Sequence, residues 1–142
     1  MALQVGLFIA YCFEVPALSF PVPKPVEWLG WGGAVLGGLI VVLALLQLNT
    51  NLSPFPKPKA NGHLVDTGLY GWVRHPIYTG IIIGSIAYAI GQGSGGKLLV
   101  AVLLTALFHY KARYEEKLLR AHFDRYPEYT QRTGRFFPSR KR

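Results

Sequence analysis

The chain has 142 residues, of which 51% are hydrophobic and 15% are charged, a balance that is unusual for a soluble domain of this size. The net charge is +8, but the basic residues lie at the ends of apolar segments and in the C-terminal tail, which indicates an anionic lipid surface rather than nucleic acid. One cysteine excludes a disulfide framework and a cysteine-based metal site, and the four histidines have no metal-ligand spacing. We therefore expect an all-α integral membrane protein without a bound metal.

The first two apolar segments cover residues 2–20 and 28–48. The second is the clearest and is long enough to cross a bilayer core of about 30 Å. The first contains Glu14, an acid that could be functional within a membrane, although we favour a place at the interface. In the second segment, Gly33 and Gly37 have the small-xxx-small spacing that favours close helix packing within one chain.

The third and fourth apolar segments cover residues 77–90 and 98–110. The third is short for a spanning helix, and the fourth is expected to continue as a helix into the cytosol through Arg120. The glycine-rich residues 91–96 between them predict a tight turn, so these two segments form a helical hairpin. The sequence thus predicts about four transmembrane helices.

Charge predicts the orientation of these helices. Four crossings place both termini and the loop of residues 49–76 on one side of the membrane. All Lys and Arg residues except Lys24 and Lys97 belong to that side, which the positive-inside rule assigns to the cytoplasm.

Two polar segments carry the residues best suited to bind a ligand. Arg74 and His75 directly precede the third apolar segment, and the adjacent Glu115 and Glu116 lie on the helix that extends the fourth. The predicted topology brings both segments to the cytoplasmic face. A carboxylate can bind an ammonium group or a ribose diol, and an Arg or His can bind a carboxylate, so the combination suits a zwitterionic ligand.

Each segment also has a plainer interpretation. Arg74 and His75, followed by Pro76, could be an interfacial anchor and a helix start. Glu116 could lie on a solvated helix face and pair with Arg120, four residues further on.

The two polar segments resemble, in the same order, the motifs of the isoprenylcysteine carboxyl methyltransferase family, a group that includes the membrane phospholipid methyltransferases. Residues 62–80 read GHLVDTGLYGWVRHPIYTG, and residues 115–138 begin with EEKLL and end with RFFP. The resemblance covers residues 49–138. It implies a small, prokaryotic-type member that is embedded in the inner membrane and transfers a methyl group from S-adenosylmethionine.

The resemblance also implies roles for individual residues. The cofactor contacts carried over by position are Leu64, Val65, Tyr70, His75, Pro76, Tyr78 and Glu115. We add Arg74 and Glu116 as further cofactor contacts, since they are adjacent to His75 and Glu115 in the sequence. We expect Lys111, one helical turn before Glu115, on the substrate side. An acceptor that must lose a proton would need a base, for which His75 and Glu116 are the candidates.

The expected organisation is a single membrane methyltransferase domain, residues 1–142. Residues 1–48 supply the first two transmembrane helices and residues 49–138 supply the cofactor-binding core. The acceptor is expected to be lipophilic or membrane-associated, with a carboxylate, thiol or amine as the methylated group.

Two other functions remain open on the sequence alone. One is a membrane reductase that binds a nicotinamide cofactor at the same face, although no dedicated phosphate loop is present. The other is a non-enzymatic membrane protein that binds anionic lipid through its basic tail, which would make no use of His75 or Glu115.

Overall fold

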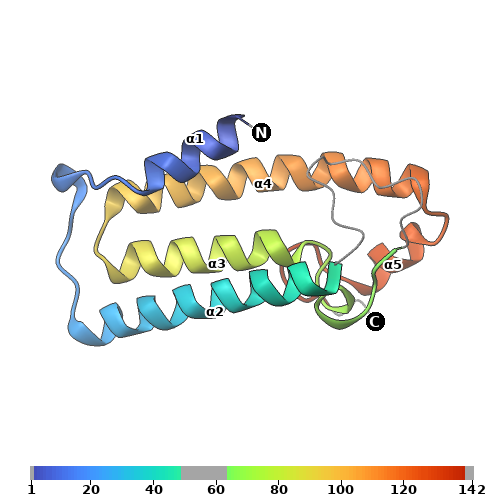
Figure 1. Ribbon diagram of the computed structural model, residues 1–142, viewed down its shortest axis with the longest axis horizontal. Coiled ribbons are helices and arrows are strands. Elements are labelled where there is room, and N and C mark those ends of the chain that lie inside the picture. Colours follow the sequence, from blue (N-terminus) through green and yellow to red (C-terminus); the bar gives the residue numbers. More distant parts are fainter. Residues whose placement is uncertain (1, 49–63, 140–142) are drawn as a thin grey trace. The chain divides into compact units, whose positions relative to one another are not determined.

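The computed structural model describes residues 2–48 and 64–139, and these residues form helices and no β-strand (Figure 1). Residues 49–63, which form the first half of the predicted loop, lie outside the described residues. The elements, in chain order, are α1 (Ala2–Tyr11), η1 (Pro16–Leu18), α2 (Lys24–Leu48), η3 (Gly68–Gly71), α3 (Pro76–Gly91), α4 (Gly95–His122) and α5 (Tyr126–Arg132).

Two of the described helices, α2 and α4, are long and apolar enough to cross a membrane. Helices α1 and α3 are apolar but shorter, with 10 and 16 residues. At about 1.5 Å per residue, α1 is about half as long as a bilayer core is thick. The structure therefore has two candidate spans and two shorter apolar helices.

Helix α1 ends well before the end of the apolar segment predicted over residues 2–20. It stops at Tyr11, and Cys12, which follows, is exposed. Pro16 then begins the short helix η1, and its fixed φ suits a first helical turn. Because Pro has no backbone N–H, a helix cannot continue regularly through this position. The long first helix expected from hydropathy alone is thus a short helix followed by a turn.

The chain divides into two compact units, and the first comprises Met1–Leu39 and Gly80–Phe108. In unit 1, α2 and α3 lie side by side and touch at glycines (Figure 1). A Cβ placed on Gly37 would come within 2.4 Å of the Gly80 carbonyl oxygen, so the backbones meet with no room for a side chain. The small-residue spacing predicted close packing, and this is what unit 1 shows.

The turn between α3 and α4 also needs glycine. Gly93 has a φ of +60°, a left-handed conformation that L side chains rarely adopt. Its carbonyl oxygen accepts a hydrogen bond from the Phe20 backbone N–H at 2.7 Å, which ties the segment after η1 to the turn. The predicted helical hairpin is therefore present.

An ion pair in unit 1 involves Glu14. The Lys97 Nζ lies 2.5 Å from the Glu14 carboxylate, and the Ser94 hydroxyl donates to the same carboxylate at 3.1 Å. Lys97 is buried, whereas half of the Glu14 side chain is exposed. Glu14 thus compensates a buried cation at the start of α4, a partner that the sequence reading did not foresee.

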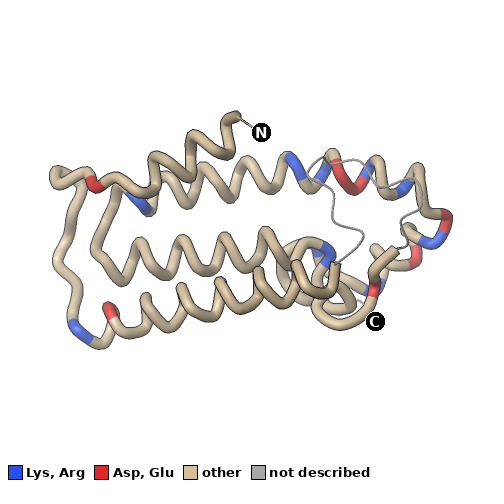
Figure 2. Tube along the Cα trace, viewed as in Figure 1, with Lys and Arg blue, Asp and Glu red and all other residues tan. Residues whose placement is uncertain are grey.

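Unit 2 comprises Ile40–Thr79 and His109–Arg142. Figure 2 shows that charged residues gather on its part of α4 and around α5. Its interior is aromatic: Tyr126 is fully buried, and the buried Tyr129 donates a hydrogen bond to the Tyr70 carbonyl oxygen at 2.6 Å. This contact joins α5 to η3 and positions the residues that follow η3.

Candidate functional site

The segment that contains Arg74 and His75 contacts the acidic pair Glu115–Glu116 within unit 2. Arg74 Nε donates to Glu116 Oε1 at 3.0 Å, and His75 Nδ1 lies 3.5 Å from Glu115 Oε2. Tyr78, in the first turn of α3, donates to Glu115 Oε1 at 2.5 Å. The residues that the sequence analysis expected to converge therefore lie together. We call this group, with Arg135, the charged cluster (Arg74, His75, Tyr78, Glu115, Glu116 and Arg135).

Backbone hydrogen bonds hold the two sides of the cluster in register. The Arg74 N–H donates to the Gly134 carbonyl oxygen at 2.8 Å, and the His75 N–H donates to that of Arg135 at 3.2 Å. The Thr79 hydroxyl lies 2.8 Å from the Phe136 carbonyl oxygen. The segment after α5 thus runs beside the start of α3, although more than fifty residues separate them in sequence.

Gly134 makes this approach possible. A Cβ at this position would lie 1.7 Å from the Phe137 carbonyl oxygen, so the turn after α5 has no space for a side chain. Arg74 reinforces the same turn, because its guanidinium donates to the carbonyl oxygens of Thr130 and Thr133. The turn therefore depends on one glycine and one arginine.

Glu116 is the most heavily bonded acid of the cluster. The whole residue is 8% exposed. Arg135 binds its carboxylate at two points, with Nε 3.0 Å from Oε1 and a terminal nitrogen 2.6 Å from Oε2. Arg74 shares Oε1. The hydrogen bond to Glu116 raises the pKa of Arg135. Because arginines bind both of its oxygens, Glu116 pairs with Arg74 and Arg135 rather than with Arg120. It therefore joins α4 to the segment before α3 and to the segment after α5.

Glu115 differs from its neighbour. Tyr78 donates to one of its oxygens, while the other lies 3.5 Å from His75 Nδ1. Its side chain is 18% exposed, against 10% for Glu116, and it forms no ion pair with a Lys or Arg of the described residues. Glu115 therefore keeps capacity to accept a hydrogen bond from a ligand.

His75 lies between the two acids. Its ring stacks on that of Tyr78, with 5.5 Å between centroids and 7° between planes. The buried Nε2 lies 3.4 Å from Glu116 Oε1 but has no hydrogen-bond partner among the described residues. A buried polar atom without such a partner is costly, so it is a natural point for a ligand contact. Lys111 Nζ lies over the Tyr78 ring, 5.5 Å from its centroid.

Within the described part of the chain, the remaining predicted site residues form no hydrogen bond or ion pair with the side chains of the cluster. Pro76 is fully buried and begins α3. Burial raises the pKa of Tyr70 to about 12, so its hydroxyl stays protonated and can donate to the Ala44 carbonyl oxygen at 3.4 Å. Leu64 and Val65 are half-buried, and no hydrogen bond among the described residues links them to the cluster.

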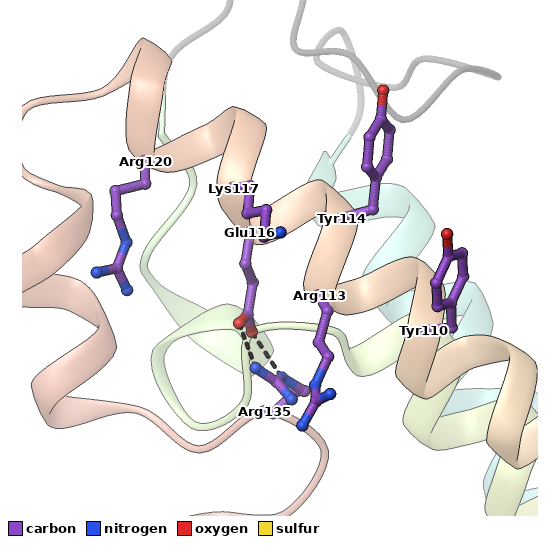
Figure 3. A pocket seen from close by; sticks show the side chains of 7 residues that line it. All are labelled: Tyr110, Arg113, Tyr114, Glu116, Lys117, Arg120 and Arg135. Carbon is purple, nitrogen blue, oxygen red and sulfur yellow. Dashed lines mark hydrogen bonds and ion pairs between the residues drawn. The ribbon is translucent and has the colours of Figure 1, made fainter.

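A cavity of about 630 Å³ borders the cluster, on α4 (Figure 3). We call it the cationic pocket. Its lining residues are Tyr110, Arg113, Tyr114, Glu116, Lys117, Arg120 and Arg135. Among the residues that the structure describes, no group of three or more His, Cys, Asp or Glu could hold a metal ion.

The sequence reading missed Arg135 as a member of the cluster, together with the carbonyl contacts from residues 133–136. Arg135 belonged to the RFFP motif that carried the family resemblance, so the signal was present without a role attached to it. Its partner Glu116 is 19 residues away, and no local spacing rule predicts such a pair.

A model of the phospholipid methyltransferase family matches residues 26–126, which is most of the chain and includes both halves of the charged cluster except Arg135. The chain belongs to the phospholipid methyltransferase family. Its sequence is also similar to two named methyltransferases. It is 32% identical to a methanethiol S-methyltransferase of Pseudomonas sp. over 80% of this chain and 44% of that protein, and 29% identical to the protein-S-isoprenylcysteine O-methyltransferase of Tribolium castaneum over 89% and 47%.

A solved structure has the same fold. It is the eukaryotic intramembrane Ras methyltransferase, isoprenylcysteine carboxyl methyltransferase, which matches with a TM-score of 0.74 and 24% identity over 96% of this chain and 51% of that one. The family match over residues 26–126 and the named relatives confirm the family resemblance predicted from the two motifs. The chain spans about half the length of the curated relatives it matches.

Proposed function

We propose that this protein transfers a methyl group from S-adenosylmethionine to a lipophilic acceptor at a membrane. The observation that carries the proposal is the meeting of His75 and Tyr78 with Glu115 in a chain of this family. The relatives named above methylate methanethiol and isoprenylcysteine, and both acceptors have apolar character.

The residues of the charged cluster fit the chemical groups of this cofactor. S-adenosylmethionine has an ammonium group, a carboxylate, a ribose diol and a positively charged sulfonium. Glu115 retains acceptor capacity for the ammonium or the diol, and the buried Nε2 of His75 lacks a hydrogen-bond partner among the described residues. Lys111, above the Tyr78 ring, offers a cation for a carboxylate of the cofactor or the acceptor.

The two adjacent acids take different parts in this proposal. Glu115 binds the ligand. Glu116, with two arginines on its carboxylate, positions the segments that carry Arg74 and Arg135 around the site. Glu116 is accordingly a poor candidate for a catalytic base, and His75 is the better one.

The cofactor supplies an already activated methyl group, so the protein mainly has to align the acceptor with it and exclude water. A carboxylate acceptor needs no base. A thiol or amine acceptor has to lose a proton, which His75 can accept when it lies within hydrogen-bond reach. Burial of His75 between Tyr78 and Phe136 keeps bulk water from that ring.

We further propose that the four apolar helices embed the chain, as one domain of residues 1–142, in the inner membrane of a prokaryote. Helices α2 and α4 would cross the bilayer, and the charged cluster and both termini would face the cytoplasm. The support is the length and hydropathy of α2 and α4 together with the distribution of Lys and Arg. The match to a methyltransferase family does not favour the reductase or the non-enzymatic alternative.

The proposal is tested by calorimetric binding of S-adenosylmethionine to the detergent-purified protein. Glu115→Gln and His75→Ala should each weaken binding about tenfold or more, because one charge-assisted hydrogen bond contributes about 1.5–3 kcal/mol. Glu128→Gln, an exposed acid on α5, is the matched control and should bind like the parent. Unchanged affinity in both cluster variants, with binding intact in the parent, would refute the site.

Candidate acceptors can then be ranked with S-adenosylmethionine carrying a labelled methyl group. We expect label in apolar thiols, prenylated cysteine analogues or phospholipids, and none in water-soluble analogues of the same functional groups. Transfer to the soluble analogues at equal rates would contradict a lipophilic acceptor.

A further inference from the structure

The cationic pocket has more positive charge than the fold neutralises. Four cations line it: Arg113, Lys117, Arg120 and Arg135. The one acid, Glu116, is already bound by Arg135 within the pocket and by Arg74 from outside it. Arg113, Lys117 and Arg120 form no ion pair with a carboxylate of the described residues. Figure 3 shows Arg113, Lys117 and Arg120 on α4 and Arg135 beside Glu116. Cations that line one pocket raise the local positive potential, which favours a bound anion.

The pocket is separate from the surface proposed to bind S-adenosylmethionine. Successive residues of an α-helix are rotated by about 100°, so Arg113, Lys117 and Arg120 form one stripe along α4. Lys111 and Glu115, which contact Tyr78, fall on a different stripe. Glu116 lies between the two surfaces and is the member of the acidic pair that lines the pocket. A ligand in the pocket therefore leaves Glu115 accessible to S-adenosylmethionine.

The position of the pocket along α4 indicates where its ligand comes from. The residues that precede it in this helix, from Leu98 to Phe108, are almost all apolar and belong to a candidate membrane span. Tyr110 and Tyr114, which also line the pocket, are 73% and 47% exposed. Tyrosines with an exposed ring next to an apolar span are typical of the bilayer interface. A cationic cavity at that depth meets lipid head groups.

From these observations we propose that the cationic pocket binds the phosphate group of an anionic phospholipid. Arginine forks and a lysine are well suited to phosphate oxygens, and the volume of about 630 Å³ lies in the range of small-ligand sites. This lipid is a ligand in addition to the methyl acceptor.

Native mass spectrometry of the detergent-purified full chain, titrated with phosphatidylglycerol or phosphatidylcholine, tests the proposal. The parent should bind phosphatidylglycerol about tenfold more tightly than phosphatidylcholine. The double variant Arg113→Gln, Lys117→Gln should lose affinity for phosphatidylglycerol by about fivefold for each removed cation, or about 25-fold in all. Arg125→Gln, which removes an exposed cation outside the pocket, is the control and should bind like the parent.

Two further measurements separate the alternatives. The double variant should keep its affinity for S-adenosylmethionine, so the pocket and the proposed methyl-donor site can fail independently. Inorganic phosphate at millimolar concentration should not displace phosphatidylglycerol, and complete displacement would show a site for free phosphate instead. A loss of about fivefold in Arg125→Gln, the same per cation as in the double variant, would also overturn the proposal, because it would show attraction to net charge alone.

Discussion

In unit 1 helices α2 and α3 approach each other at glycines that leave no room for a side chain, whereas in unit 2 the segments are joined by charged side chains around Glu116. A backbone contact at Gly37 fixes the distance between two helices and tolerates no added atom. The bonds to Glu116 instead fix the directions of individual side chains, which a binding site requires. The difference teaches that this chain uses apolar packing for its scaffold and ionic hydrogen bonds for its candidate site.

The largest effect is expected from removing the carboxylate that joins unit 2. Glu116→Ala leaves Arg74 and Arg135 without their acidic partner in a largely buried place, and the loss of one member of a buried ion pair costs about 3–5 kcal/mol. Chemical denaturation in detergent micelles measures the free energy of unfolding. Glu115→Gln is the matched comparison and should destabilise the fold much less, although it weakens binding of S-adenosylmethionine about tenfold or more. Similar stabilities for both variants would erase the distinction between the two acids.

An intermediate effect is expected from one methyl group in unit 1. In Gly37→Ala the new Cβ would meet backbone atoms of Gly80 and Gly84, and overpacking of this kind costs about 1–3 kcal/mol. Gly38 is a precise control because a Cβ there has no described atom within 4 Å. Gly38→Ala should leave stability unchanged or raise it slightly, since Ala favours helix. Melting temperatures of the two variants in the same detergent would measure the contrast, and equal values would contradict glycine packing.

The smallest effect is expected from one neutral hydrogen bond in unit 2. Tyr129→Phe removes the bond from the buried hydroxyl to the Tyr70 carbonyl oxygen and should cost about 1 kcal/mol. Tyr110→Phe, at an exposed position, should be neutral in the same denaturation experiment. A loss for Tyr129→Phe as large as that for Glu116→Ala would mean that this one neutral hydrogen bond stabilises unit 2 as much as the ionic bonds of Glu116 do.

The sequence predicted those features that depend on local patterns. Hydropathy located α2, α3 and α4, the glycine-rich residues 91–96 predicted the turn, and glycine spacing predicted the packing of α2. It overestimated the first helix, since apolar composition continues beyond Tyr11 while the chain turns at Pro16. Helix α5 was not predicted because it has only seven residues and most of them are polar. Its two buried tyrosines, Tyr126 and Tyr129, are too few to show the hydrophobic periodicity of a helix.

Long-range pairs were beyond local rules. Arg74 and Glu116 are 42 residues apart, and the pairing of Lys97 with Glu14 spans 83 residues. The first pair was anticipated in outline because a family resemblance joined the two motifs and the predicted topology returned both to one face. The second had no such support. The turn at Gly134 is followed by Arg135, which binds Glu116 and not Glu115. No sequence pattern predicted this turn, so the sequence did not show which acid the arginines would bind.

Cys12 offers a practical consequence. It is the one cysteine of the chain, and its side chain is exposed just after α1. Under the proposed topology, a maleimide dye that does not permeate the bilayer should label it from one compartment alone, with no engineered residue and no second thiol in the sequence. Labelling of intact cells compared with opened vesicles therefore reports the orientation of the native sequence in a single gel.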